Sequence, residues 1–472
     1  MRNHPSFWRR FVFLFVFAAI LSFRGAAQES LPEERGEYLT VKIAIMGPGS
    51  ELYFWWGHIA LIIEDSLSGQ TRFYDYGIFS FDSEDFYFGF VRGRLYYRCG
   101  VSPAELNFRI YTMTNRDITL YTLDLPPETR EEVRRFAETN VLPENRNYYY
   151  HHFKDNCATR IRDILDLATG GQFKEAFVQA PSPFTLRQQV RRHTWFSPFM
   201  DWLLNFLMGQ DIDVPITAWQ EMFLPQAIGD HILDFRYTDV RGTERKLVSD
   251  VGILNRAVNR PPVLERPRRQ WIRELAMGLF IAVFLVFLRF FKEKRRSLGG
   301  FLWGLVQGFM GLFFGIFGLV LFFMTFFSDH DYTWHNINVL FVNPLWFAAM
   351  VWGIRLACAP SFGEREAPEF FLKCFWTGVF VLCLSTIPIK LLPFFYQQNQ
   401  VTQALLLPIT FVLGWFPDWL LALKKRINKG EAVSKRPVLK LAEGVSKYQI
   451  LEPAQPDEPP GDERVSRVQR VS

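Results

Sequence analysis

The pattern of apolar positions changes near residue 270. Before it, short apolar runs alternate with polar residues, and after it the apolar runs are long and carry few charges. Alternation with a period of two is typical of a half-buried strand, whereas about 20 apolar residues in a row can cross a membrane as a helix. We therefore expect a soluble α+β domain over residues 28–270 and an all-α transmembrane domain over residues 271–427.

Three runs in the soluble part predict β-strands, at Leu39–Met46, His58–Glu64 and Gln70–Tyr76. A Ser/Gly turn separates the last two runs, which predicts an antiparallel hairpin. Residues that face each other across such a hairpin lie about 5 Å apart. Tyr74, Asp75 or Tyr76 should therefore lie across from His58, and the register, which the turn does not fix, decides which of them does.

Five apolar runs predict membrane-spanning helices, at Leu275–Phe291, Leu298–Phe327, Ile337–Ala357, Cys374–Leu392 and Val401–Leu421. Basic clusters follow the first run, at Lys292–Arg296, and the last run, at Lys424–Arg426. Four spans separate the two clusters, so both can lie on one side of the membrane. The positive-inside rule makes that side cytoplasmic and places the soluble domain outside.

The sequence pattern at each end of the chain predicts a segment that lies outside the folded domains. Arg9 and Arg10 precede an apolar run from Phe11 to Phe23, and small residues follow at Gly25–Ala27. This pattern predicts a signal peptide over residues 1–27, with an uncleaved anchor as the alternative. Residues 428–472 are charged and rich in Pro, which predicts a disordered cytoplasmic tail. We expect a multi-pass protein of the bacterial cytoplasmic membrane with a periplasmic soluble domain.

Residues 148–166, YYYHHFKDNCATRIRDILD, predict the start of a helix. Apolar residues recur at helical spacing from Ala158 to Ala168, and Asp155 and Asn156 just before them are good N-cap residues. Cys157 therefore falls in the first turn, where free backbone N–H groups and the positive end of the helix dipole stabilise a thiolate. The alternative is that Cys157 is a small, buried apolar residue.

His58 is the residue that could activate this thiol. It lies in a β-branched, aromatic run directly after Gly57. A His base on a strand that faces a Cys at a helix start is the papain-type arrangement, and the alternative is a His satisfied within the core. Asp75 is the acid best suited to orient the imidazole, unless it simply ends its strand. The predicted catalytic residues are thus Cys157, His58 and Asp75.

Composition and motifs exclude several other classes of function. The formal net charge of +5 is too small to indicate nucleic-acid binding. The chain has no C-x-x-C, H-E-x-x-H, Walker or G-x-G-x-x-G pattern, so no metal and no cofactor is expected. His151 and His152 are adjacent, so on a strand they would point to opposite faces and could not share a metal.

One predicted outer loop, Ser328–Asn338, is unusually polar for a connection between two spans. Polar and ionisable groups at such a place are costly unless they face water or a site. The loop is therefore either a plain solvated connection or an element that supports the soluble domain. Arg92 and Arg94 leave a similar choice, between a phosphate-binding pair and a solvated basic edge.

The order of these motifs points to a family. With the His before the Cys, the soluble domain resembles the permuted members of the NlpC/P60 superfamily. Over roughly residues 39–421 the chain resembles the Lnb lipoprotein N-acyltransferases. The segments that carry this resemblance are FWWGHIAL, FYDYGIF, FVRGRLYY, FKDNCATRIRDIL, EMFLP and DHDYTWHNINVLFVNPLW.

The resemblance implies a papain-like domain joined to five membrane helices. It implies an enzyme that moves an acyl chain from a phospholipid, through a thioester on Cys157, to the N-terminal amine of a diacylglyceryl lipoprotein. The partners expected are the phospholipid donor, the lipoprotein acceptor and the membrane, without nucleic acid. The alternatives are a membrane-associated phospholipase, a papain-like cell-wall amidase and a non-enzymatic membrane sensor.

Overall fold

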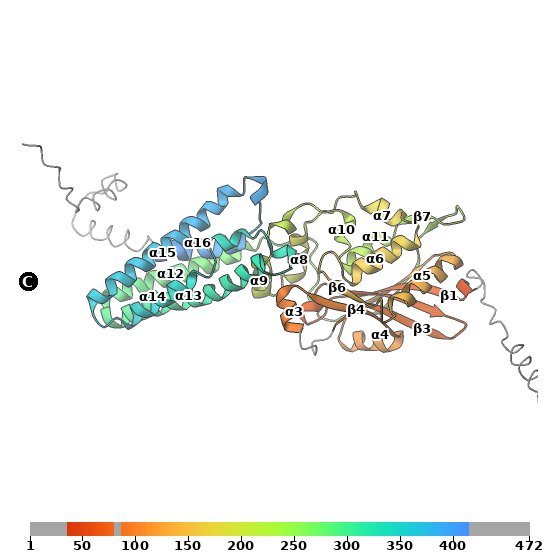
Figure 1. Cartoon of the computed structure of the whole chain (residues 1–472), viewed down its shortest axis with the longest axis horizontal. Helices are drawn as coiled ribbons and strands as arrows, with labels where there is room; N and C mark the ends of the chain where they lie inside the picture. Colours follow the sequence, from red (N-terminus) through yellow and green to blue (C-terminus); the bar gives the residue numbers. More distant parts are fainter. Residues whose placement is uncertain (1–34, 80–85, 415–472) are drawn as a thin grey trace, which may run out of the picture. The chain divides into compact units, whose positions relative to one another are not determined.

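The computed structural model describes residues 35–79 and 86–414. The predicted signal peptide over residues 1–27, the predicted tail over residues 428–472 and the last part of the fifth predicted span lie outside the described residues. Within the described residues, a domain built on a β-sheet comes first and a helical part follows (Figure 1). This confirms the predicted order of an α+β part and an all-α part, whereas a papain-like fold in the narrower sense stays a prediction.

A seven-stranded sheet forms the centre of the first domain, with every pair of neighbouring strands antiparallel. The strand order is β6-β4-β3-β2-β1-β5-β9. The strands are β1 (Leu39–Met46), β2 (His58–Asp65), β3 (Gln70–Ile78), β4 (Leu95–Pro103), β5 (Ile118–Leu123), β6 (Asn147–Tyr150) and β9 (Val248–Asn255). The three predicted strands are confirmed as β1, β2 and β3, and the predicted hairpin joins β2 to β3.

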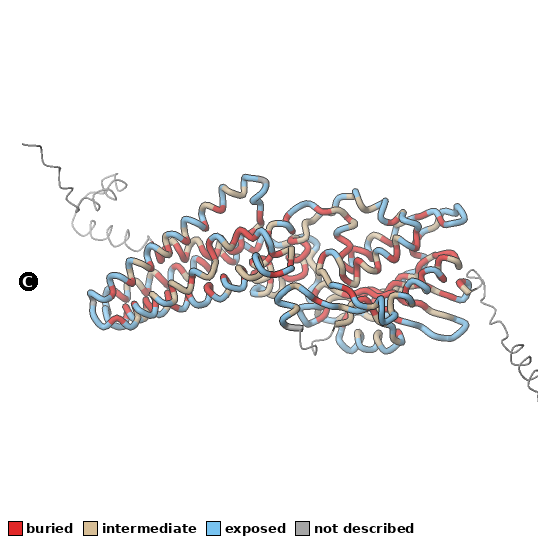
Figure 2. The backbone as a smooth tube through the Cα atoms, in the orientation of Figure 1, coloured by how far each residue is buried: buried red, intermediate tan, exposed pale blue. Residues whose placement is uncertain are grey.

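Helices cover both faces of this sheet. Figure 1 shows α4 (Ala104–Met113) on one side, and α5 (Pro127–Asn140) and α6 (Cys157–Ala168) on the other. The alternation along β2 divides the core accordingly, because Ile59, Leu61 and Ile63 belong to the cluster packed against α6. Ala60 and Ile62 belong to the cluster on the α4 side. The central strands β1 and β2 are consequently buried on both faces, and the middle of the sheet is red in Figure 2.

Short elements complete the first domain. They are η1 (Leu52–Phe54), α3 (Phe86–Arg92), α7 (Gln172–Phe177), α8 (Leu186–Thr194), α9 (Pro198–Leu207), η2 (Gln210–Asp213), α10 (Ala218–Glu221), α11 (Pro225–Ile232), β7 (Arg236–Thr238) and β8 (Glu244–Lys246). The apolar α9 packs into the core of the helical part through Trp202 and Phe206. The first of the three arginines of α8, Arg187, is fully buried and pairs with Asp213 at 2.8 Å, which ties α8 to η2.

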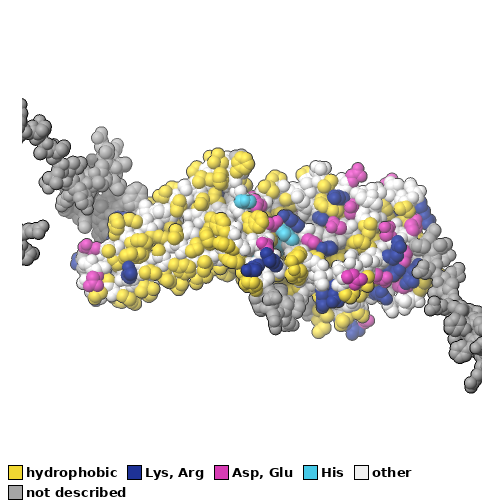
Figure 3. All heavy atoms as spheres, in the orientation of Figure 1, with side chains coloured by type: hydrophobic (Ala, Val, Ile, Leu, Met, Phe, Trp, Pro, Cys, Tyr) yellow, Lys and Arg dark blue, Asp and Glu magenta, His cyan; other side chains and the backbone are white. Residues whose placement is uncertain are grey.

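Three helices of the second part are long and apolar enough to cross a membrane: α12 (Trp271–Lys294), α13 (Arg296–Phe326) and α15 (Phe362–Ile389). The other two predicted spans correspond to shorter apolar helices, α14 (Trp346–Cys358) and α16 (Gln400–Gly414). Large apolar side chains such as Phe280 and Phe287 point outward, with 76% and 69% of their surface exposed. Figure 3 shows hydrophobic side chains spread over this part, as a lipid-facing surface requires. Five spans remain a prediction.

Two helices of this part begin at other residues than the predicted spans. Helix α14 begins at Trp346 rather than at Ile337, because residues 337–340 form a short 3-10 helix, η4 (Ile337–Leu340). Side chains on either side of its start, Asn336 and Asn338, donate hydrogen bonds to the Phe206 carbonyl at the end of α9, which anchors this segment outside the helix. Helix α15, which contains the fourth predicted span, begins at Phe362 rather than at Cys374, and Ser361 caps it by accepting from the Glu364 N–H.

Candidate functional site

Cys157 is the first residue of α6, as the sequence predicts, and Asn156 is the N-cap. The Asn156 Oδ1 atom accepts from the N–H groups of Ala158 at 2.8 Å and Thr159 at 3.0 Å. The Thr159 hydroxyl in turn accepts from the Asn156 N–H at 2.8 Å. This capping box fixes the first turn of the helix and therefore the place of the Cys157 sulfur.

The cap also determines which backbone donors remain for chemistry. Asn156 takes up the N–H groups of Ala158 and Thr159, so they cannot bind a substrate oxygen. In the part of the chain that the structure describes, the Cys157 N–H has no acceptor. That single N–H group, and not the whole helix start, is thus the backbone donor available beside the sulfur.

The side chains of His58 and Asp75 are joined by a hydrogen bond of 3.0 Å between Nε2 and Oδ1. Asp75 lies opposite Ala60 in the register, two residues from His58 along the same face, and reaches the imidazole diagonally. The prediction that Tyr74, Asp75 or Tyr76 lies across from His58 is therefore wrong in its register. Continued by two residues, the observed register brings Gly77 there.

The His58 imidazole occupies space that is open only because Gly77 has no side chain. A Cβ atom at this position would lie 2.6 Å from Cε1 of His58 and 3.3 Å from Oδ1 of Asp75. The Gly77 N–H donates to the same Asp75 oxygen at 2.7 Å. With the Asp75 carboxylate on Nε2, that nitrogen carries the proton and Nδ1 remains free to act as a base.

Cys157 acts electrostatically on His58, although α6 packs on one face of the sheet and the His58 ring lies against α4 on the other. His58, the first residue of β2, stacks on Tyr111 of α4 with ring centroids 6.1 Å apart. Burial by itself lowers the pKa of His58, but Tyr111, Asp75 and the Cys157 sulfur favour the charged ring and raise the pKa well above its usual value. The three predicted residues thus interact, which favours an imidazolium beside the thiol.

The same environment keeps Asp75 ionised. Burial by itself raises the pKa of a carboxyl group, yet the pKa of Asp75 is lowered by His58, by the Gly77 N–H and by Arg116. The carboxylate can therefore hold the His58 ring in one orientation throughout the neutral pH range, and the neutral ring in one tautomer.

Arg116 is a member of the site that the sequence did not single out. Only 1% of its surface is exposed, and its Nε donates to the Gly47 carbonyl at 2.8 Å. The two terminal nitrogens have no hydrogen-bond partner among the described residues, and the guanidinium lies over the rings of Phe54 and Tyr111, at 4.7 and 4.8 Å. A buried cation of this kind stabilises negative charge on nearby groups, and it interacts with both Asp75 and Cys157.

Tyrosine side chains complete the surroundings of the sulfur. Burial, reinforced by Cys157, raises the pKa values of Tyr97, Tyr148 and Tyr150. These phenols stay protonated at neutral pH and can act only as neutral hydrogen-bonding groups. The second cysteine of the soluble domain, Cys99, is buried, and burial raises the pKa of its thiol to about 12. Cys99 is therefore unsuited to be a nucleophile.

Gly77→Ala should displace the His58 ring and slow the alkylation of Cys157 by iodoacetamide at neutral pH. The backbone of Gly77 does not have a positive φ, so the new methyl group acts only through its contact with the imidazole. A displacement of about 1 Å can reduce the rate of a positioned reaction by about 100-fold. Gly252→Ala is the matched control, because a Cβ there meets nothing within 4 Å. Equal alkylation of the two variants would remove His58 from the site.

Asp75→Asn should shift the pH profile of Cys157 alkylation to higher pH. The pKa of His58 is raised, so the ring stays protonated until the pH rises through that value. Loss of the carboxylate lowers the pKa of His58 toward its ordinary value. The imidazolium that stabilises the thiolate is therefore lost at a lower pH than in the unaltered chain. Alkylation at pH 7 should therefore be slower in the variant, and a profile equal to that of the unaltered chain would contradict this role of Asp75. Asp234→Asn, at a side chain that is 98% exposed, should leave the profile unchanged.

The soluble domain that carries this site is similar to a known protein family. Residues 33–192 match the family model described as the Lnb N-terminal periplasmic domain. Searches of curated proteins and of solved structures returned no match. The matched range contains His58, Asp75 and Cys157, and the chain continues into the apolar helices. The chain is therefore a membrane protein with a periplasmic domain, and that domain matches the Lnb family over residues 33–192.

Proposed function

We propose that this protein is an acyltransferase of the bacterial cytoplasmic membrane, which transfers a fatty acyl chain from a phospholipid to the N-terminal amine of diacylglyceryl lipoproteins. One observation carries the proposal. A thiol at a capped helix start lies beside a His–Asp pair, in an Lnb domain whose chain continues into apolar helices. The catalytic roles follow from that arrangement: Cys157 is the nucleophile, His58 the acid and base, and Asp75 the residue that orients His58.

In the first half-reaction the Cys157 thiolate attacks the ester carbonyl of the phospholipid. A bond forms between sulfur and the carbonyl carbon as the bond to the glycerol oxygen breaks. His58 delivers its proton to that oxygen, which releases a lysophospholipid and leaves a thioester. The Cys157 N–H can donate to the oxyanion, and the charge of Arg116 stabilises the site while the carbonyl oxygen is negative.

In the second half-reaction the α-amino group of the lipoprotein attacks the thioester carbon. His58, now neutral, takes the proton that the amine loses on attack, and the carbon–sulfur bond breaks to regenerate the thiolate. An α-amino group has an ordinary pKa near 8, so a useful fraction is neutral without special activation. Tyr97 and Tyr150 stay protonated at neutral pH and so cannot act as bases that activate water, which suits a site that must disfavour hydrolysis.

The helical part fits this reaction better than it fits the alternatives. Both substrates carry acyl chains, and a domain held at the membrane can receive both without extracting them into water. A cell-wall amidase needs no such helices, and a sensor needs no thiol beside a His–Asp pair. A phospholipase shares the first half-reaction, so only the fate of the thioester separates it from a transferase.

The thioester should persist with phospholipid alone and disappear when a diacylglyceryl lipopeptide is added. We expect purified protein to show a hydroxylamine-sensitive acyl adduct on the Cys157 peptide by mass spectrometry, and Cys157→Ala to show none. The acyl chain should then appear as an amide on the lipopeptide. Release of free fatty acid at the same rate with and without lipopeptide would instead establish a phospholipase.

A further inference from the structure

The polar loop after α13 binds the periplasmic domain through its own polar groups. The Asp329 N–H donates to the Arg92 carbonyl at 2.7 Å, and the Asp329 carboxylate pairs with Arg94 at 2.7 Å. The His330 Nε2 atom donates to the Phe90 carbonyl at 2.8 Å. The loop is therefore not a plain solvated connection, and Arg92 and Arg94, the candidate phosphate-binding pair, contact it.

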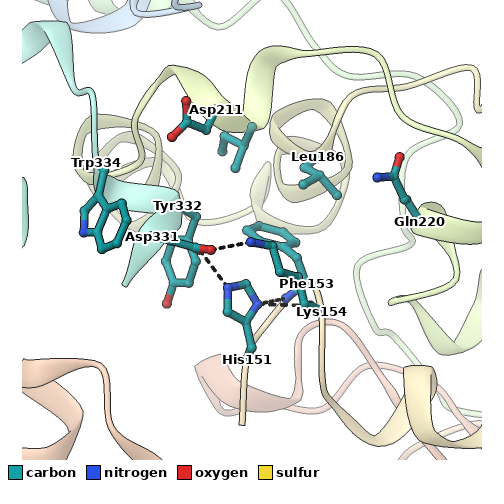
Figure 4. Close-up of a pocket in the computed structure, with 10 residues that line it drawn as sticks. His151, Phe153, Lys154, Leu186, Asp211, Gln220, Asp331, Tyr332 and Trp334 are labelled. Carbon is teal, nitrogen blue, oxygen red and sulfur yellow. Dashed lines mark hydrogen bonds and ion pairs between the residues drawn. The ribbon is translucent and has the colours of Figure 1, made fainter. Parts of the chain in front are cut away.

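Asp331 of the same loop reaches the segment that precedes the nucleophile. Its carboxylate accepts a hydrogen bond of 2.7 Å from Nε2 of His151 and pairs with the Lys154 ammonium (Figure 4). The bond from His151, together with Lys154, holds the pKa of Asp331 well below its usual range although burial opposes this. Asp331 is therefore a fixed negative charge opposite His151.

The other nitrogen of His151 closes a turn of the backbone. Its Nδ1 atom accepts from the N–H groups of Phe153 at 3.1 Å and Lys154 at 3.0 Å. An atom that accepts two N–H groups carries no proton, so the proton must be on Nε2, where Asp331 receives it. The same turn is closed by paired backbone hydrogen bonds between His151 and Asp155, at 2.8 and 3.0 Å.

This turn leads directly into the helix cap. The Asn156 side chain donates to the His152 carbonyl at 2.7 Å while its oxygen holds the first turn of α6. Any loosening of residues 151–155 therefore acts on Asn156 and through it on Cys157.

Packing alone does not hold the His151 ring in place. One side of the ring borders a cavity of about 380 Å³, which is drawn in Figure 4. The cavity is lined by His151, Phe153, Lys154, Leu186, Asp211, Ile212, Gln220, Asp331, Tyr332 and Trp334. Because packing leaves that side of the ring open, its orientation and tautomer depend on the hydrogen bonds at its two nitrogens, and Asp331 is the acceptor for the Nε2 proton.

We propose that Asp331 is a positioning residue for Cys157, acting from the membrane part of the chain through His151. Its carboxylate keeps the proton on Nε2, which leaves Nδ1 to hold the turn before the helix cap. The inference takes from the proposed function only that Cys157 is the nucleophile. The polar loop thereby makes the geometry of the thiol depend on the docking of the two parts of the protein.

The test measures the alkylation of Cys157 in the full-length protein in membranes, by peptide mass spectrometry after a pulse of a membrane-impermeant maleimide. Asp331→Ala should slow alkylation at neutral pH by about tenfold, the low end of what a hydrogen bond to a charged group contributes. Asp329→Ala is the matched control from the same loop. This variant removes the ion pair between Asp329 and Arg94, whose side chains are 55% and 57% exposed. It should leave the rate of Cys157 alkylation unchanged.

A double-mutant cycle separates positioning from a general loss of stability. His151→Asn keeps an acceptor near the place of Nδ1 and has no tautomer to select, so it should alkylate at close to the normal rate. In that background Asp331→Ala should have almost no further effect. His151→Ala removes the acceptor and should be about as slow as Asp331→Ala.

Two outcomes would overturn the proposal. One is normal alkylation of both Asp331→Ala and His151→Ala. The other is a tenfold loss from Asp331→Ala that persists in the His151→Asn background. If Asp331→Ala does not insert into the membrane, the comparison of His151→Asn with His151→Ala replaces it. Equal alkylation rates in those two variants would overturn the proposal. Alkylation that follows the expected pattern in a protein without acyl transfer would refute the proposed function alone.

Discussion

The arrangement of the site depends on the hydrogen bonds of one buried side chain, Asn156. Its oxygen binds two N–H groups of the first turn of α6, and its amide donates to the carbonyls of His152 and Phe223. Asn156 is only 5% exposed, so each lost bond would leave a polar group unpaired in the interior. This side chain joins the helix that carries the thiol to the turn before it and to the segment after α10.

Around this fixed point the charges of the site are matched. Asp75 and a Cys157 thiolate are negative, while Arg116 and a protonated His58 are positive, and each interacts with at least two of the others. The Arg116 guanidinium would be costly in isolation, because two of its nitrogens lack hydrogen-bond partners. The nearby negative charges and the rings of Phe54 and Tyr111 are what make its burial tolerable.

The sequence predicts the local features of this site well. Periodicity places β1, β2, β3 and the start of α6, because each depends on residues close together in the chain. The N-cap preference of Asn is likewise local, and it places Cys157 correctly.

Features that depend on distant contacts were not predictable in this way. The register that puts Gly77 rather than Asp75 across from His58 is set by packing of the whole sheet, and a glycine in a strand pattern indicated it only weakly. Arg116 follows an exposed helix in the sequence and becomes part of the site only through the fold. The start of α14 is delayed by bonds from Asn336 and Asn338 to α9, more than 100 residues earlier in the chain.

The central claim is that the thiol of Cys157 adds an acyl chain to lipoprotein N-termini. The most direct measurement is mass spectrometry of lipoprotein N-terminal peptides from cells whose only source of this activity is the present chain or its Cys157→Ala variant. We predict an amide-linked third acyl chain with the unaltered chain and a free amine with the variant, at equal amounts of membrane-inserted protein. N-terminal amines that are acylated in both, or free in both, would contradict this account.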